Sequence, residues 1–397
     1  MRISTSAMIE QSVRSMNAQQ NNLAKIQSQI SSQKRMLTAA DDPAAWAKGM
    51  SLDQVLGNID TYKSNIGTAQ QRLGLEENAL SDSGNILQSV SALAIQATNG
   101  SQSPQSLQAI TAQLQQYYSQ LVSDANAQDG QGHYLFAGSN SGTAPFTQSG
   151  NSVSYNGDTS TRLLAIGPGR TIADGDDGAS VFMNNFSGNG TFASTAASTN
   201  SGSAQLTNSQ LADASLWDGG TYKVGFNAGN YQVTDSANNV IASGTYKDGD
   251  SVSFRGAKLT FSGTPADGDT FTVSPSAPKD VFASLRDLIS LVQSPVTGTA
   301  QRAQWQTQMQ GLQTEISRAF DTVTNVRSDV GARMSTLDDA SNRLSDQSVA
   351  TQTMLSDVRD LDLAQASTQL NLTTVSLQAL QLAYTKVQSL SLFQYLR

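Results

Sequence analysis

Few residues of this sequence have the type and spacing that catalysis requires. His133 is the only histidine, and it stands in the segment Gly130–Tyr134 beside an expected helix-to-strand junction. A lone histidine at such a place is a packing residue more often than a catalytic one, so we expect packing. The sequence has no cysteine, which excludes disulfides, thiol catalysis and cysteine-ligated metal.

Two glycine-containing segments could in principle bind an ion or a phosphate. Asp174–Gly178 reads Asp-Gly-Asp-Asp-Gly, as at the start of a calcium loop, but that loop's glycine falls on Ala179 and 181–185 supplies no Glu. We therefore predict a solvated turn. Gly167–Arg170 lacks the Gly-Lys-Ser/Thr ending and the following helix of a phosphate loop. These patterns predict no enzyme, and no metal or cofactor site.

The pattern that dominates the chain is apolar and lies near both ends. In residues 3–38, Ile9, Met16, Leu23 and Ile30 recur every seven residues, without Pro or Gly between them. In residues 355–397 the same spacing recurs from Leu363 through Leu370 and Leu377 to Tyr384, again without a helix breaker. Each stretch alone fits an ordinary amphipathic helix, whereas two matched seams in one chain favour a coiled-coil pair.

The C-terminal stretch carries more apolar surface than one such pairing needs. Leu361, Leu372, Val375, Ala379, Leu382, Phe393 and Leu396 fall on a second face. A helix at the edge of a self-contained domain needs one stripe about 100° wide. We therefore expect contact with another molecule, and we predict these subunit-packing residues: Ile9, Met16, Leu23, Ile30, Leu363, Leu370, Leu377, Leu380, Val387, Leu390, Leu392, Phe393 and Leu396.

Long helices are also predicted next to the two ends. Asp42 suits an N-cap and Pro43 a first helical turn, which starts a helix expected to run to Thr98. A shorter helix follows from Pro104, another spans about 281–292, and helix resumes near Ala300 without a proline to the end. Seven-residue repeats mark these helices at Leu52, Ile59, Ile66, Leu73, Leu80 and Leu87, and at Met309, Ile316, Val323, Val330, Leu337 and Leu344.

The middle of the chain has a different composition. Residues 130–280 hold 22 of the 31 glycines, and alternating segments there are separated by turn dipeptides such as Asp218-Gly219 and Asp248-Gly249. We predict strands near 153–155, 221–226, 231–233, 251–254, 258–261 and 270–273. Residues 192–210, rich in Ser, Thr, Ala and Asn, are expected to form a surface excursion. The fold class is thus mainly α with an inserted antiparallel β domain.

Charge and hydropathy restrict the partners. A net charge of −8 and a pI near 4.7 give no electrostatic footprint for nucleic acid. No apolar run approaches the roughly 18 residues of a membrane span, and residues 1–20 lack the apolar core of a signal peptide. We expect no nucleic acid, no membrane insertion, and either a cytosolic protein or one exported without a cleaved signal.

Several short motifs resemble those of bacterial flagellins. Ile30–Arg35 followed by Ala40–Ala44 is similar to the flagellin N-terminal signature, with Gln33 where that pattern usually has glycine. The remaining motifs resemble a narrower group, the FlgL-type hook-associated protein 3 that joins hook to filament. They are Met1–Thr5, Gly132–Gly138 with Pro145-Phe146, Tyr155–Asp158, and Lys386–Leu396.

The resemblance implies a layered fold and a location. It implies an inner domain D0 from residues 1–42 and 360–397, a helical domain D1 with a β-hairpin from 43–180 and 279–359, and a variable outer β domain D2 from 181–278. It further implies an extracellular protein of the flagellum, exported unfolded by the flagellar secretion apparatus. Its expected partners are its own copies in a ring, a neighbouring hook-associated protein, flagellin and an export chaperone.

The expected function is therefore structural, a non-catalytic junction between hook and filament. Two alternatives stay open at this point. The first is flagellin itself, the bulk filament subunit. The second is a surface adhesin or carbohydrate-binding module, for which Trp217, Tyr222, Tyr231 and Tyr246 would be the aromatic candidates, although the same four residues suit core packing better.

Overall fold

The computed structural model describes residues 5–100, 102–150 and 152–395, with side chains described between residues 7 and 388. The chain divides into two compact units, Met1–Ser64 with Ala340–Arg397, and Asn65–Asp339. The observed class is mainly α with an antiparallel β insertion, which confirms the predicted fold class.

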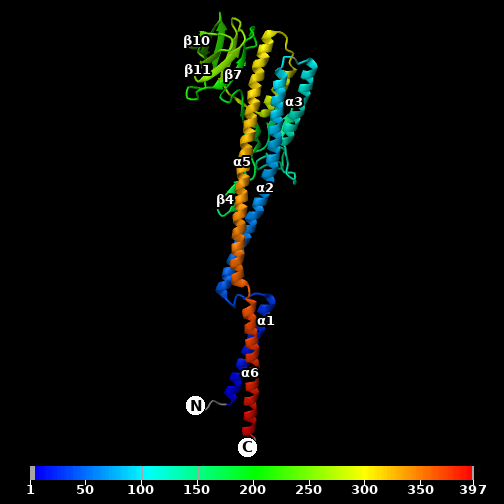
Figure 1. The fold of residues 1–397 in the computed structure, drawn as a ribbon, viewed down its shortest axis with the longest axis vertical. Helices are drawn as coiled ribbons and strands as arrows, with labels where there is room; N and C mark the ends of the chain where they lie inside the picture. The colour runs from blue at the N-terminus through cyan, green and yellow to red at the C-terminus, as the bar shows by residue number, and fades with distance from the viewer. Residues whose placement is uncertain (1–4, 101, 151, 396–397) are drawn as a thin grey trace. The chain divides into compact units, whose positions relative to one another are not determined.

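The first unit is built on an antiparallel pair of helices. Helix α1 (Thr5–Ser32) packs along α6 (Leu363–Tyr395), and the unit also contains the start of α2 (Pro43–Thr98) and the end of α5 (Thr299–Arg359) (Figure 1). The Asp42 side chain accepts a bond from Ala45 N at 3.0 Å, so the predicted N-cap of α2 is confirmed.

Two predicted helix lengths in this unit are wrong. The first helix stops at Ser32 rather than near residue 38, because Gln33 adopts a left-handed φ of 55°. The last stretch is not one helix from residue 355, although it has neither Pro nor Gly. The helix is interrupted at residues 360–362. There, Leu361 N donates a hydrogen bond to Gln33 O, just after the end of α1, at 3.0 Å. The Asp362 carboxylate then caps α6 by accepting from Ala364 N at 2.9 Å.

The helical core of the second unit follows the predicted repeats. Helices α2 and α5 enter it, together with α3 (Pro104–Ala125) and α4 (Val281–Gln293), and α3 packs on α4. The seven-residue positions Leu73, Leu80 and Leu87 are fully buried, as are Ile316, Val323, Val330 and Leu337. The repeat therefore marks the buried stripe of each long helix.

Between α3 and α4 lie short strands around an aromatic cluster. The hairpins are β1 (Phe146–Ser149) with β2 (Ser152–Tyr155), and β3 (Leu163–Gly167) with β4 (Arg170–Ala173), followed by a π-helical turn at Ala179–Met183. Buried rings of Phe136, Phe146, Phe182 and Phe282 contact one another with centroids 5.3–6.0 Å apart. Gly138, at φ 67°, lies so close to Asp158 that an added Cβ would sit 2.3 Å from its carbonyl oxygen. The motifs at 132–138 and 155–158 are thus packed on each other.

The inserted domain is a two-sheet β structure. A five-stranded sheet has the order β10-β9-β8-β13-β6 and a three-stranded sheet the order β11-β12-β7. Their bounds are β6 (Phe192–Ala196), β7 (Gln205–Leu211), β8 (Tyr222–Asn227), β9 (Asn230–Asp235), β10 (Val240–Thr245), β11 (Ser251–Phe254), β12 (Ala257–Ser262) and β13 (Thr270–Pro275). The short strands β5 (Asn185–Phe186) and β14 (Pro278–Lys279) pair with each other, so the two ends of the insertion lie side by side.

The core of this domain decides two predictions, the surface excursion at residues 192–210 and the role of four aromatic residues. Residues 192–210 are not a surface excursion, because Phe192 of β6, Leu206 of β7 and Ala204 just before β7 are buried in the core of the domain, whereas Thr195 and Thr207 are exposed. The aromatic residues proposed for glycan binding take the packing role instead. Tyr222 is buried, and Trp217, Tyr231 and Tyr246 pack against the same core.

Candidate functional site

The α1 side of the terminal helix pair holds the predicted seam residues in partly buried positions. Ile9, Met16, Leu23 and Ile30 are all half-buried, and Ile26 between them is buried. This is the burial that one partner helix gives to a stripe at seven-residue spacing.

Helix α6 is covered on only one side. Leu370, Leu377, Leu380 and Val387 are half-buried, and the smaller residues Ala366 and Thr373 are buried among them. Leu363, which continues the same repeat, is 47% exposed. Leu390, Leu392 and Phe393 belong to α6 but their side chains lie outside the described ones, and Leu396 lies outside the described residues.

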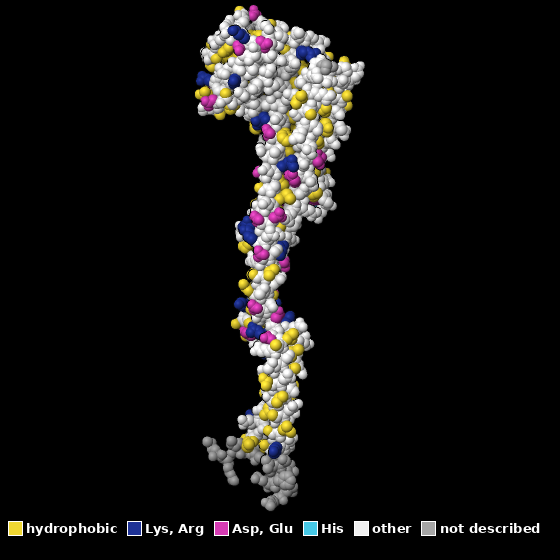
Figure 2. Space-filling view, in the orientation of Figure 1, with side chains coloured by type: hydrophobic (Ala, Val, Ile, Leu, Met, Phe, Trp, Pro, Cys, Tyr) yellow, Lys and Arg dark blue, Asp and Glu magenta, His cyan; other side chains and the backbone are white. Residues whose placement is uncertain are grey.

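The uncovered side of α6 is apolar and almost without charge. Leu372, Val375 and Leu382 are 59%, 62% and 71% exposed and lie three to seven residues apart. Only Lys386 is charged among residues 363–395. Figure 2 shows apolar side chains exposed along this pair of helices. We call Leu372, Val375 and Leu382 the outer face of α6; it lies on the second face that the sequence indicated.

Exposed apolar residues are concentrated in the first unit. Of the twelve large apolar side chains that are exposed among the described ones, eight lie in this unit, which holds fewer than half of the residues: Met8, Met50, Val349, Met354, Leu363, Leu372, Val375 and Leu382. Three of them form the outer face of α6, and an exposed apolar face of this kind is typical of a protein–protein contact. It also exceeds what the intramolecular pairing of α1 and α6 can bury.

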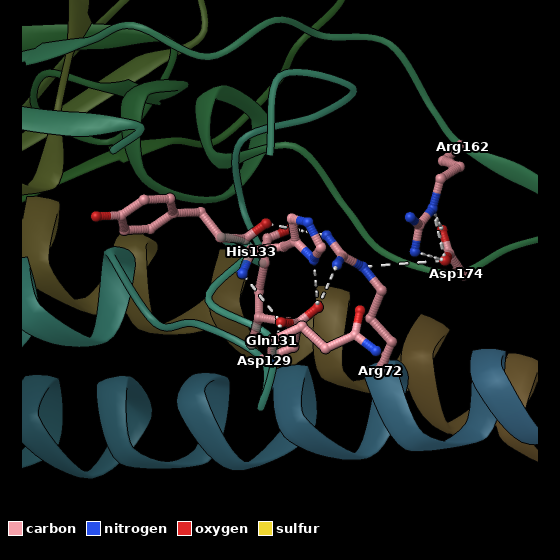
Figure 3. A network of polar contacts seen from close by, with 8 residues as sticks. Arg72, Asp129, Gln131, His133, Arg162 and Asp174 are labelled. Atoms are coloured by element: carbon pink, nitrogen blue, oxygen red, sulfur yellow. Dashed lines mark hydrogen bonds and ion pairs between the residues drawn. The ribbon is translucent and has the colours of Figure 1, made fainter. Parts of the chain in front are cut away.

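A separate cluster of charged residues joins α2 to the two loops that the sequence singled out. Arg72 of α2 donates to the carbonyl oxygens of Tyr134 and Leu135 at 3.0 and 3.1 Å, and its guanidinium lies 3.6 Å from Asp129 and 3.9 Å from Asp174 (Figure 3). Arg162 donates from Nε to both carboxylate oxygens of Asp174, at 3.0 and 2.8 Å. Burial lowers the pKa of Arg72, and the nearby Arg162 charge lowers it further.

This cluster corrects the prediction of a solvated turn at 174–178. The Asp174 side chain is only 1% exposed because the two guanidinium groups enclose it. Asp176 N donates to Glu76 Oε1 at 3.0 Å, and the Asp176 carboxylate pairs with Arg333 of α5. Burial raises the pKa of Glu76 well above its ordinary value, and the nearby Asp176 charge adds to this. The loop is therefore held against α2 and α5 by hydrogen bonds and ion pairs, and it is not a solvated turn.

His133 is not the packing residue that the sequence predicted. It is exposed, with Nδ1 3.5 Å from Asp129 Oδ2. Burial alone would raise the pKa of Asp129, but the N–H groups of His133 and Gln131, each 2.9 Å away, hold it below its ordinary value. The carboxylate thus organises the loop, and the arrangement offers a structural clamp rather than an acid–base pair.

The sequence held one signal of this clamp. In the α2 repeat, the position three residues after Leu73 is the second core position, and the buried side chain of Glu76 occupies it. Polar residues at core positions require buried partners. The identity of those partners, about 60 to 260 residues away in the chain, could not be inferred from spacing.

Two further observations limit the chemistry of the described residues. No group of three or more His, Asp or Glu side chains among them is placed to hold a metal ion. Within the same part of the chain, no helix is long and apolar enough to cross a membrane. A groove of about 670 Å³ beside α3 is lined by glutamines, prolines and Trp305, with Arg302 as its only charged residue.

Comparison with protein families gives matches at both ends and in the insertion. The bacterial flagellin N-terminal helical region matches residues 3–141, and the bacterial flagellin C-terminal helical region matches residues 314–396. Residues 195–275 match the D2-like domain of flagellar hook-associated protein 1.

Individual proteins similar to this chain carry related names. The flagellar hook-associated protein 3 of Salmonella typhimurium is 32% identical over 182 residues, which are 46% of this chain and 57% of that protein. FlgL of Xanthomonas campestris is 36% identical, with 77% of this chain and 99% of that chain covered and a TM-score of 0.72. The flagellar junction protein FlgL of Legionella pneumophila is 29% identical, with 73% and 99% covered and a TM-score of 0.68.

Paired helices from the two ends of the chain, with a β domain inserted between long helices, define a flagellin-like protein. Within that class, the chain belongs to the FlgL family. The matched region spans 57% of the length of the Salmonella protein.

Proposed function

We propose that this protein is a structural, non-catalytic component of the bacterial flagellum that forms the junction between hook and filament. The observation that carries the proposal is the outer face of α6, which is apolar, nearly uncharged and uncovered within the chain. Full burial of a large apolar side chain contributes about 1.5–3 kcal/mol. Three such side chains, repeated at every copy in a ring, would contribute to the contacts between subunits.

The proposed partners follow from the same surface. Neighbouring copies would cover the outer face of α6, with the other predicted packing residues of α1 and α6 beside it. A hook-associated protein on one side and flagellin on the other would complete the contacts, and an export chaperone would cover the same apolar residues before assembly. We propose an extracellular location in the flagellum, reached through the flagellar secretion apparatus.

We also propose the three-layer division that the resemblance implies. The α1–α6 pair would form the inner layer D0, the helical core the layer D1, and the two-sheet insertion the outer layer D2. The match of residues 195–275 to a D2-like domain supports the outermost assignment. The pairing of β5 with β14 supports boundaries near residues 181 and 278.

Removal of the gene from its host tests this function. The proposal predicts cells that bear hooks without filaments and that shed flagellin into the medium, as seen by electron microscopy and by blotting of the culture supernatant. A plasmid copy should restore filaments. Filaments of normal length and number in the deletion strain would exclude the junction function. If the protein were instead the bulk subunit, it would be the main component of purified filaments.

A further inference from the structure

Between Gln304 and Arg318, one face of α5 carries the polar side chains that are typical of an exposed helix face. Gln304, Thr307, Gly311, Glu315 and Arg318 recur at spacings of three or four residues, which places them on one side of the helix. On the opposite side, Met309, Leu312 and Ile316 are buried in the helical core. We call the polar side the α5 stripe.

Two polar side chains of the α5 stripe are buried, and its other residues are half-buried. Thr307 is 1% exposed and Glu315 is 6% exposed. A buried polar side chain is costly unless it is hydrogen-bonded. The α5 stripe must therefore have specific partners, and Figure 1 shows the inserted domain beside this part of α5.

The partners are backbone groups of the inserted domain. Gln304 Nε2 donates to Asn200 O at 2.8 Å, and Leu206 N donates to Thr307 Oγ1 at 3.0 Å. Arg318 Nη1 donates to Asn189 O at 2.7 Å. The Thr307 hydroxyl also donates to Ala303 O of its own helix at 2.9 Å, so its hydrogen-bonding capacity is used on both sides.

The Glu315 carboxylate accepts hydrogen bonds from residues at both ends of the insertion. Its Oε1 accepts from Gly188 N at 3.1 Å, just after the chain has entered the domain. Its Oε2 accepts from Lys279 Nζ at 2.8 Å, just after the chain has left the domain, and from Ser284 Oγ of α4 at 2.9 Å. One carboxylate thus fixes the entry strand, the exit strand and the next helix.

We propose that the α5 stripe is a docking surface that holds the inserted domain in one orientation. The bonds are spread along α5 from Gln304 to Arg318, about four helical turns, which prevents rotation about the entry and exit strands. Most of these bonds use backbone groups of the domain. Two positions of the inserted segment contribute more specifically: Asn185 Nδ2 donates to Glu315 O at 3.1 Å, and an added Cβ at Gly190 would lie 2.0 Å from the Arg318 guanidinium. The domain can therefore change in sequence at other positions and still be held rigidly.

Spin labels test this orientation directly, and the absence of native cysteine makes labelling specific. Gln308→Cys on α5 and Asn227→Cys in the inserted domain are both at exposed positions. Pulsed electron paramagnetic resonance on the full chain should give one narrow distance distribution. The triple variant Gln304→Ala, Thr307→Val, Arg318→Met should broaden it at least twofold. The control Thr336→Val removes an exposed α5 hydroxyl bonded only within its helix, to Ala332 O, and should leave the width unchanged.

Amide exchange gives a second readout that uses only a mild variant. Thr307→Val keeps the side-chain shape and removes the acceptor of Leu206 N, so exchange around Leu206 should accelerate about tenfold or more. Val224 and Phe271, in the core of the domain, should stay protected, which shows that the domain remains folded. A narrow distance distribution in the triple variant together with unchanged exchange at Leu206 would overturn the proposal. A broad distribution in the unsubstituted chain would also overturn it.

Discussion

A single residue, Gln33, ends α1 in a conformation that most side chains avoid. Its φ of 55° places it at the position where helices commonly end on glycine, and its carbonyl accepts the bond from Leu361 N. The flagellin pattern has glycine here, so the special geometry is retained by this chain with a glutamine. A non-glycine residue in this region costs about 1–2 kcal/mol.

We therefore expect Gln33→Gly to stabilise the first unit by about 0.5–1 kcal/mol, since relief of the strain is partly offset by the greater freedom of glycine in the unfolded chain. Gln33→Ala removes the same side chain and keeps the strain, so it should give no gain. Thermal melts followed by circular dichroism would compare the two. Equal stability of the two variants would show that the backbone at residue 33 is not strained.

A carboxylate pair near the end of α3 makes stability depend on pH. Burial raises the pKa of Asp124 to about 6, and the charge of nearby Asp82 adds to it; Asp124 Oδ2 is buried without a hydrogen bond. Because the folded pKa lies above the ordinary value of 3.8, the charged form opposes folding above about pH 6. That cost disappears as the pH falls towards 4.

Asp124→Asn should accordingly stabilise the second unit at pH 7.5 by roughly 1 kcal/mol, a value reduced for solvent screening at this partly exposed site. The gain should vanish near pH 4, and Asp82→Asn should give a smaller gain with the same pH dependence. Urea denaturation at several pH values measures both. A gain of equal size at pH 4 and pH 7.5 would show that ionisation of Asp124 is not its cause.

At the scale of elements, the two units differ in how well their helices are buried. Helices α2 and α5 bury whole leucine and valine side chains in the second unit, whereas α1 and α6 leave most of their seam half-buried. Helices without extensive packing are marginal in water. The α1–α6 pair should therefore open far more often in the isolated monomer than the helical core of the second unit.

Amide exchange on a proven monomer should show this difference. We expect little protection in residues 7–32 and 363–388 and strong protection in residues 65–98 and 305–339. Binding of other copies should then protect the terminal pair. Equal protection of the four segments in the monomer would mean that α1 and α6 are stable without a partner.

The sequence predicted long elements better than short ones, for physical reasons. Asp42, Pro43 and a repeat of six positions predicted the start and the course of α2. Strands β6 and β7 were not predicted because only a few of their residues are large and apolar, and their burial depends on a facing sheet. The charged clamp around Arg72 was not predicted because its members are distant in the chain.

At the scale of the whole molecule, the inserted domain can be removed from the helical core because its two ends lie next to each other. Ser187 N donates to Ala277 O at 2.9 Å, and Phe186 pairs with Pro278, so the two connections are already adjacent strands. The α5 stripe beneath the domain is polar, and its exposure to water would not create an apolar surface. Both features favour a domain that can be lost without loss of the helical core.

Replacement of residues 188–276 by Gly-Gly tests this separability, since two residues can connect adjacent antiparallel strands. We expect the helical core to melt within a few degrees of the full chain, and filaments to stay attached in complemented cells. The full chain is the control for expression and export. Loss of filaments by a well-folded, exported deletion variant would show that the outer domain takes part in the junction.

The most direct test of the central claim is the triple substitution Leu372→Gln, Val375→Gln, Leu382→Gln on the outer face of α6. These side chains are already exposed, so the thermal melt of the monomer should stay unchanged, while complemented cells should export the protein and lose their filaments. Leu216→Gln with Val240→Gln is the matched control, because these residues of the inserted domain are 57% and 54% exposed. The control should retain filaments; normal filaments in cells carrying the triple variant would contradict the account.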